Sequence, residues 1–433
     1  MRFIHTADWH LGNQMHEIDR REEAQNFLIW LKSQIIEKKA NTLVISGDIF
    51  DTSNPPIEAR RLYYSFLASL INTCCKNVII VGGNHDSASM LDSAKELLEV
   101  LNIRVVGSIN NLELNDMCFE LFDENKNVCG ICIALPFVRE LELRNFLMNS
   151  ENKEKILDSD LFSLAYKELY SKLYGEAEKL RSGREIPIIA TGHLYASDLE
   201  GRLSEKKSNE KTDDGVKVLD VLGTLGNVPP SVFPKADYIA LGHIHYSTMV
   251  TKNPAIRYSG SPFVMGFDEA NIPHCVLCVD VEKKENFLKV EKIETPQIYV
   301  YKRISGEISE IRSELQKFSG IFEKDGKNSK KIFLELCYKR EIGVNIQEIL
   351  SDSIRALPEN VSVVSWKIAD SEKFFEKNAF ENFDASEIRN LDDNEIFTQL
   401  ILSKSGLKAE DENGKLAIEK FLPLFLKLAE EVE

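Results

Sequence analysis

The first half of the chain alternates short apolar runs with polar clusters. The runs are rich in valine, isoleucine and leucine, as buried strands are. Between them, apolar positions recur at helical spacing from Glu22 to Lys38 and from Glu58 to Asn72. Strands that alternate with helices predict a layered α/β fold. The expected strands cover residues 3–5, 42–46, 78–81, 187–190 and 238–241.

Each expected strand ends in a cluster of polar residues. In α/β proteins, active sites gather beyond the carboxyl ends of the strands. Five strand ends that offer aspartate, histidine or asparagine therefore predict a single site. The clusters are ADWH at 7–10, GD at 47–48, GGNHD at 82–86, GH at 192–193 and GHIH at 242–245.

The pattern predicts three parts of the chain. Residues 1–285 form the α/β part, with a charged, leucine-rich helical insertion at about 139–185. Residues 286–378 form a small α+β unit, and residues 379–433 form a polar linker followed by two helical patterns. Within the small unit, we expect strands at 299–304, 331–338 and 361–370 and helices at 306–318 and 345–357.

The C-terminal segment places apolar residues at a spacing of 3.6 residues, which is typical of amphipathic helices. Such helices either pack on the chain's own body or dock into a groove of another protein. The polar linker ahead of them favours the second alternative. The apolar positions are Ile396, Phe397, Leu400, Ile401, Ile418, Phe421, Leu424, Phe425 and Leu428.

Composition narrows the class of protein. The chain has 433 residues, of which 43% are hydrophobic and 28% charged, as expected for a globular protein. No apolar run approaches the length of a membrane span, and the N-terminus lacks the features of a secretory signal. We therefore expect a cytoplasmic protein. The net charge of −16 means that binding to nucleic acid would need local patches and bound cations.

The chain contains two CxxC pairs, a spacing that is found in zinc sites. Cys129 and Cys132, like Cys275 and Cys278, lie in apolar runs that are typical of strands. Residues i and i+3 of a strand point to opposite faces, so neither pair converges on one metal ion. We expect reduced thiols packed in the core.

The strand-end residues together indicate chemistry that none of them indicates alone. The D-x-H and H-x-H spacings each place two donors on one side of an extended segment. Several oxygen and nitrogen donors can hold two divalent cations, and a shared carboxylate can bridge them. The remaining histidines, His5, His16 and His274, are predicted to be structural or surface residues. The candidates are Asp8, His10, Asp48, Asn84, His85, His193, His243 and His245.

In this order, the blocks DxH, GD, GNHD, GH and GHxH resemble the signature of calcineurin-like metallophosphoesterases. Four segments are similar in sequence to those of the bacterial SbcD-type nucleases. They are HTADWHLG at 5–12, GDIFDTSNPP at 47–56, GNHDS at 83–87 and YSGSP at 258–262. This resemblance implies a calcineurin-like αββα sandwich, a small α+β cap and C-terminal helices. It also implies hydrolysis of DNA phosphodiesters by exonuclease and endonuclease action in DNA repair, recombination and replication.

The resemblance also implies roles for individual residues. Two metal ions, with Mn²⁺ favoured, would share Asp48 as a bridge. His85 would face the substrate phosphate and the leaving oxygen. Asp86 either orients the His85 ring or caps the loop, and both alternatives remain open. The first ion would be held by Asp8, His10, Asp48 and His245, and the second by Asp48, Asn84, His193 and His243.

The implied partners are DNA and SbcC, an ABC-type ATPase with a long coiled coil, in a heterotetramer that contains a homodimer of this chain. No membrane is involved, and association with the nucleoid is expected. Two further functions remain open. One is a protein phosphatase or small-nucleotide phosphodiesterase on the same fold. The other is a scaffold without activity.

The sequence does not decide the roles of three residues beside the expected ligands. Trp9 and Leu11 flank the expected metal ligands and either touch DNA or pack in the core, and packing is favoured. Asp51 stands in the GDxF block where some relatives outside the bacterial branch have a second histidine. Its effect on exonuclease action is therefore open.

Overall fold

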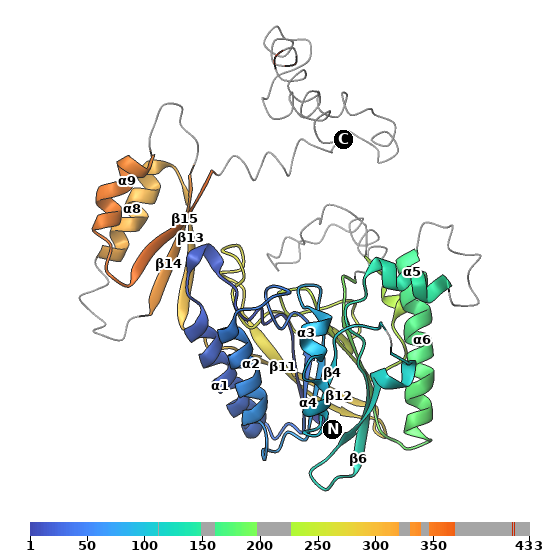
Figure 1. Ribbon diagram of the computed structural model, residues 1–433. Coiled ribbons are helices and arrows are strands. Elements are labelled where there is room, and N and C mark those ends of the chain that lie inside the picture. Colours follow the sequence, from blue (N-terminus) through green and yellow to red (C-terminus); the bar gives the residue numbers. More distant parts are fainter. Residues whose placement is uncertain are drawn as a thin grey trace. The chain divides into compact units, whose positions relative to one another are not determined.

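The computed structural model describes residues 1–110, 112–148, 161–196, 227–319, 330–338, 346–368, 418 and 420 (Figure 1). The chain divides into two compact units, Met1–Tyr301 and Lys302–Glu433, and each is described by itself. The predicted linker and the apolar C-terminal positions, except Ile418, lie outside the described residues.

The first unit contains two six-stranded sheets. The first has the order β12-β11-β1-β2-β3-β4. Strands β1 to β4 are parallel to one another, β11 pairs antiparallel with β1, and β12 pairs antiparallel with β11. The second has the order β5-β6-β7-β8-β10-β9. The strands of the first sheet are β1 (Arg2–Thr6), β2 (Thr42–Ser46), β3 (Asn77–Val81), β4 (Ile103–Val106), β11 (Cys275–Glu282) and β12 (Phe287–Glu294). Those of the second are β5 (Cys118–Phe122), β6 (Val128–Ile133), β7 (Ile188–His193), β8 (Tyr238–Gly242), β9 (Thr248–Met249) and β10 (Ile256–Tyr258).

Helices cover the outer faces of both sheets, as Figure 1 shows. α1 (Arg21–Glu37) and α2 (Ile57–Ser69) pack on the first sheet, and α6 (Leu161–Arg181) packs on the second. Strand β2 is buried along its whole length because Leu43 and Ile45 face the α1–α2 layer while Val44 faces the second sheet. The predicted αββα sandwich is confirmed. Shorter elements are α3 (Ala88–Asp92), α4 (Lys95–Glu99), α5 (Glu140–Met148) and the turns Met15–Glu17, Leu114–Met117 and Pro230–Val232.

The expected helical insertion supplies one layer of the sandwich. Helix α6 buries Leu169 and Leu173 in the same core as the second sheet. The hydroxyl of Tyr170 donates a hydrogen bond to the carbonyl of Thr191 on β7, at 2.8 Å. Helix α6 is therefore integral to the fold of the first unit.

The boundary between the units falls later than the polar composition predicted. We expected it at residue 285, but β12 pairs with β11 along its length and the first unit ends at Tyr301. The reason is that β12 is an edge strand with partly exposed alternating positions, so its charged composition resembles that of a linker.

The second unit is the expected α+β unit. Its sheet has the order β13-β14-β15, and the described helices bury apolar residues such as Leu315 and Leu350 against Leu334 and Leu336. The strands and helices expected in this part of the chain are therefore present in the structure. They are β13 (Tyr299–Gly306), α8 (Ile308–Ser319), β14 (Lys331–Tyr338), α9 (Ile346–Arg355) and β15 (Val361–Ile368).

The structure confirms the expected orientation of one CxxC pair and contains no candidate membrane span among the described residues. Cys275 and Cys278 lie in the two different cores of the sandwich, which confirms that they face opposite ways, and both are free thiols. Among the described residues, no helix has both the length and the apolar character needed to cross a membrane.

His5 is a buried histidine that makes stability depend on pH. Its Nδ1 lies 3.1 Å from the Tyr238 hydroxyl and its Nε2 lies 3.2 Å from the Leu241 carbonyl. Burial lowers the pKa of His5 to about 3. Between pH 6.5 and this value the unfolded chain binds the extra proton, so stability falls as the pH drops, by up to about 1.4 kcal/mol per pH unit.

His5→Gln should therefore lose less stability between pH 7 and pH 5 than the unsubstituted chain. The measurement is urea unfolding at both pH values with metal removed by chelator. Equal losses in the two proteins would show that His5 does not carry this pH dependence.

Candidate metal centre

The carboxyl ends of β1, β2, β3, β7 and β8 bring the predicted residues together. Asp8, His10 and His245 offer ligand atoms that lie within 4.8 Å of one another. Asp48, His193 and His243 form a second group within the same limit. The predicted ligands fall in two neighbouring sets, and the structure brings the members of each set together.

Asp48 lies between the two groups. Its Oδ2 atom is 3.2 Å from His193 Nε2 and 3.7 Å from His10 Nε2. One carboxylate therefore reaches a ring nitrogen of each group, which is the position that a bridging ligand needs.

Asn84 belongs to the second group. Its Oδ1 atom is 3.0 Å from His193 Nε2 and 3.0 Å from His243 Nδ1. A neutral amide oxygen at this point adds a donor without adding negative charge. The chain thus offers imidazole, carboxylate and amide donors within one small volume.

The backbone is held in left-handed conformations at four of these residues. The φ angles of Asp8, His10, Asp48 and His243 are 54°, 43°, 49° and 98°. Each such residue costs about 1–3 kcal/mol, and such strain collects at functional sites. Hydrogen bonds between the loops hold the geometry: Asp8 N donates to Gly47 O and His10 N donates to Asp48 O, both at 3.0 Å.

Glycine is required beside Asp48. A Cβ atom at Gly83 would collide with the Asp48 carboxylate, and at Gly47 it would collide with the His193 ring. Gly47 also has a φ of 93°, which favours glycine. The glycines of the GD and GNHD blocks therefore allow the loops to approach closely enough to form the site.

Buried atoms in the site fit a bound cation. Asp8, His10, Asp48 and His193 are all at least 97% buried. Asp8 Oδ2 and His10 Nε2 are buried and have no hydrogen-bond partner among the described residues. Buried polar atoms are normally paired, because an unpaired one costs free energy. A divalent ion between these atoms would satisfy both.

Burial and the neighbouring charges shift the pKa values of several groups in the site. Burial raises the pKa of Asp8 above its ordinary value. Burial alone would lower the pKa of His193, but the Asp48 carboxylate outweighs it and raises the pKa to about 9. The pKa of Asp48 falls below its ordinary range, because its attraction to His193 and His10 outweighs burial. Burial and the neighbouring His193 lower the pKa of His243 to about 4.

A second layer of contacts orients the rings. His193 Nδ1 lies 2.8 Å from the carbonyl of Ser46, and His245 Nδ1 lies 3.1 Å from Glu269 Oε1. Glu269 also accepts a hydrogen bond from Met265 N at 2.8 Å. Sequence reasoning missed Glu269, because it lies in a loop and follows neither a strand nor a recognised block.

His85 lies at the edge of the same site with its side chain exposed. Its backbone N donates to Asp48 Oδ1 at 2.9 Å, and its Nδ1 lies 2.8 Å from the carbonyl of Asp51. Its ring lies 4.8 Å from that of His10. The remaining ring nitrogen, Nε2, is therefore the one available to a substrate.

Asp86 does not orient the His85 ring, which was one of its two expected roles. Its carboxylate accepts hydrogen bonds from the backbone N atoms of Ile49 and Gly83 at 3.1 and 2.9 Å, and from Phe50 N at 2.9 Å. The ring nitrogen that it was expected to contact is instead 2.8 Å from the Asp51 carbonyl. Asp86 ties the GNHD loop to the GD loop, as the loop-cap alternative stated.

The neighbours of the ligands fit the structural alternatives. Trp9 and Leu11 are each 1% exposed, and the Trp9 ring packs edge-on against Phe27 and Phe66. They are core residues, as expected. Asp51 accepts a hydrogen bond from Asn13 Nδ2 at 2.9 Å, and its Oδ1 lies 3.4 Å from His10 Nδ1. Asp51, His10 and His85 also offer ligand atoms within 4.8 Å of one another, so Asp51 contacts a candidate ligand directly.

The comparisons with known proteins agree with this geometry. The family model for calcineurin-like phosphoesterases matches residues 1–247, and the chain belongs to that family. The chain is 30% identical over 367 residues to the SbcD subunit of the nuclease SbcCD from Escherichia coli K12, covering 84% of this chain and 83% of the relative. Within the family, it therefore belongs with the SbcD subunits.

Relatives of lower identity carry the same name. The SbcD subunit from Rhodobacter capsulatus is 29% identical over 288 residues, or 65% of this chain and 66% of the relative. That from Bacillus subtilis is 26% identical over 288 residues, or 66% and 67%. The resemblance that was seen in the sequence blocks is confirmed over most of the chain.

Proposed function

We propose that this chain is a two-metal DNA nuclease that works as the SbcD subunit of an SbcCD complex. The position of Asp48 between two groups of ligand atoms carries the proposal. In this assignment, the first ion is held by Asp8, His10, Asp48 and His245, and the second by Asp48, Asn84, His193 and His243.

Mn²⁺ is the ion that we propose for both positions. A mixture of imidazole, carboxylate and amide donors suits Mn²⁺, Fe²⁺ or Zn²⁺ better than Mg²⁺, which prefers oxygen donors and keeps several waters. The buried and unpaired Asp8 Oδ2 and His10 Nε2 support a resident ion at the first position.

The chain's own residues would prepare the reaction. When bound, the two ions would supply the positive charge that activates a water and neutralises the phosphate for in-line attack. The loops at Gly47 and Gly83 hold the bridging carboxylate in place. His85, held through Nδ1 at the Asp51 carbonyl, would present Nε2 to the leaving oxygen and donate a proton to it.

DNA is the proposed substrate, cleaved from ends and at hairpins. The names of the SbcD relatives support a nuclease. The chain itself carries a net charge of −16, which repels nucleic acid. Bound cations at the site would therefore be needed both to attract the phosphate and to cleave it.

The decisive experiment is digestion of an end-labelled hairpin duplex with Mn²⁺, with and without the SbcC-type ATPase and ATP. We expect metal-dependent loss of the label and opening of the hairpin, regulated by the ATPase. Rapid hydrolysis of p-nitrophenyl phosphate with no cleavage of DNA would instead support a phosphatase. A metal content near zero in the purified protein would support a scaffold.

Glu269→Gln should weaken metal binding at the first position by about 10–100-fold, because carboxylates behind a ligating histidine fix the ring and raise its basicity. Glu269 contacts His245 Nδ1 and belongs to neither group of proposed ligands. Isothermal titration with Mn²⁺ measures the effect. Glu291→Gln is a matched control. Glu291 pairs with Lys38 and belongs to neither group of proposed ligands, so this variant should bind metal normally.

We further propose that the C-terminal apolar positions bind the ATPase partner. A chain ending at Asn394 should keep metal-dependent nuclease activity, because all proposed ligands precede it, and should lose the partner. Co-purification tests this prediction. A shortened chain that binds the partner with full affinity would place the docking site elsewhere.

A homodimer within a heterotetramer is the proposed assembly. Leu97 on α4 and Val100 directly after it are 70% and 81% exposed, which supports a contact between copies at this helix. Sedimentation of the isolated chain gives the oligomeric state. A monomer at micromolar concentration would contradict the homodimer.

A further inference from the structure

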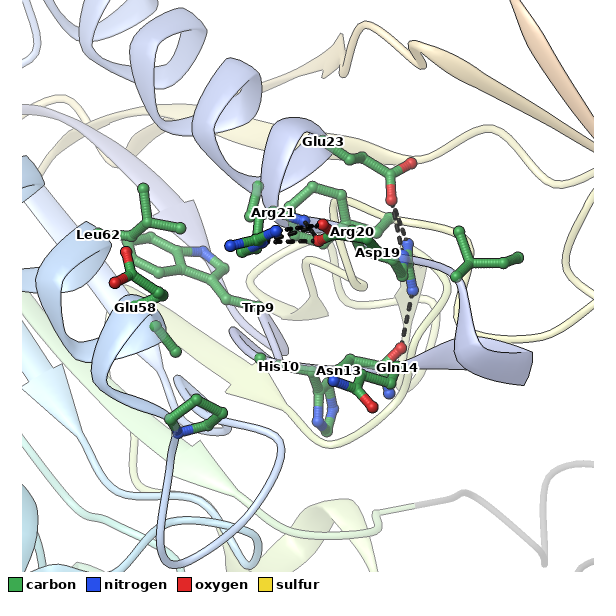
Figure 2. Close-up of a pocket in the computed structure, with 16 residues that line it drawn as sticks. Trp9, His10, Asn13, Gln14, Asp19, Arg20, Arg21, Glu23, Glu58 and Leu62 are labelled. Atoms are coloured by element: carbon green, nitrogen blue, oxygen red, sulfur yellow. Dashed lines mark hydrogen bonds and ion pairs between the residues drawn. The ribbon is translucent and has the colours of Figure 1, made fainter. Parts of the chain in front are cut away.

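A cavity of about 390 Å³ opens beside the metal centre. His10 lines it, so the cavity shares a side chain with the first group of ligands. In Figure 2, Trp9 and Leu62 lie on one side, Arg20 lies on the other, and Asn13 lies near His10. A group that entered the cavity would lie beside the loop that carries His10.

The walls of the cavity are mostly apolar. Trp9, Ile18 and Phe263 are at most 6% exposed, and Leu62 adds a half-buried side chain from α2. The exposed amide of Gln14 lies at the same cavity. The Phe263 ring is covered by Arg20, so the apolar surface open to a ligand comes from Leu62 and Pro56. This surface, with an amide nearby, suits a planar group that carries hydrogen-bonding edges.

The charged residues of the cavity do not suit an anion. Two arginines and three carboxylates line it, and the arginines are already paired. Arg20 contacts Glu23 at 2.7 Å, and Arg21 contacts Asp19 at 2.6 Å. The third carboxylate belongs to Glu58. A phosphate would therefore be repelled here, whereas a neutral planar group would not.

The cavity wall is also connected to the proposed proton donor. Arg20 donates a hydrogen bond to Asn13 Oδ1 at 3.0 Å, and Asn13 Nδ2 donates to Asp51 Oδ1 at 2.9 Å. The carbonyl of Asp51 in turn lies 2.8 Å from His85 Nδ1. A ligand that orders this wall would also steady the loop that positions His85.

We propose that this cavity binds one nucleobase of the substrate strand, unstacked from the DNA next to the scissile phosphate. The proposal rests on the proposed nuclease function and adds a binding site for the base to it. An apolar wall accepts any base, since every base presents a flat face. The site would hold the strand in register without reading its sequence.

The test uses duplexes in which a single abasic nucleotide is placed at successive positions from the end. For the full chain with Mn²⁺, kcat/KM on the intact duplex should exceed that on one abasic duplex by roughly 5- to 100-fold, the range for one stacked base. The loss should occur at one position beside the cleaved bond and be small at positions farther along the duplex.

Leu62→Trp fills the cavity, and the smaller Leu62→Phe serves if the tryptophan variant does not fold. In either variant the ratio of intact to abasic kcat/KM should fall to about 1. Ala68→Trp, at an exposed position of α2 away from the cavity, should keep the ratio of the unsubstituted chain. Because the ratio is internal to each protein, a general loss of activity does not mimic the result.

Two outcomes would overturn the proposal: equal cleavage of all abasic and intact duplexes by the unsubstituted chain, or an unchanged ratio in the cavity-filled variants. A failure of the proposed function has a different signature. In that case, the unsubstituted chain would cleave neither intact nor abasic DNA in Mn²⁺.

Discussion

Asp48→Asn should reduce DNA cleavage to background, by at least about 10³-fold. The reason is that two cations held by one bridging carboxylate would stabilise the transition state by several kcal/mol. The substitution keeps the shape of the side chain and removes its charge. Asp48 Oδ2 is the atom that lies 3.2 Å from His193 Nε2 and 3.7 Å from His10 Nε2. An amide cannot replace a carboxylate that serves two ions, so Mn²⁺ titration should fall from two sites to one or none.

Folding should survive this substitution, because Asp48 serves the site and both cores of the sandwich lack its side chain. Circular dichroism and thermal unfolding in chelator measure this. Asp280→Asn is the matched control: Asp280 lies on β11, pairs with Arg2 at 2.6 Å and is not among the candidate ligand groups. It should still bind two ions. Normal cleavage by Asp48→Asn would refute the two-metal assignment.

Most of the candidate site was predictable because the strands and the polar residues at their ends are encoded locally. Short apolar runs end in Asp8, Asp48 and His193, and parallel strands bring their carboxyl ends to one edge. These residues are far apart along the chain, but the packing of β2 and β3 against β7 and β8 of the other sheet brings them together. Periodicity therefore predicted both the layers and the position of the site.

Other features depend on contacts that no local pattern encodes. Glu269 reaches His245 from a loop, where neither alternation nor helical spacing marks it. The choice between two roles for Asp86 was decided by backbone N atoms of another loop. The polar composition of β12 predicted a domain boundary, because an exposed edge strand has the composition of a linker.

His85→Ala should slow DNA cleavage by about 10²–10⁴-fold while both metal ions and the affinity for DNA are retained, which is the size expected for loss of a general acid. The backbone N of His85 donates to Asp48 Oδ1, and that contact survives the substitution. Only the exposed ring is lost, with its Nδ1 held by the Asp51 carbonyl and its Nε2 available to the substrate.

Substrates with different leaving groups distinguish a general acid from a metal ligand at His85. A nitrophenolate leaves without needing a proton, so bis(p-nitrophenyl) phosphate should be hydrolysed by His85→Ala with a much smaller loss than DNA. His10→Ala, which removes the neighbouring ring 4.8 Å away, should instead lose metal and slow both substrates alike. Single-turnover cleavage and metal content measure both variants. If His85→Ala also loses an ion, His85 is a ligand, and the proton must reach the leaving oxygen from another group.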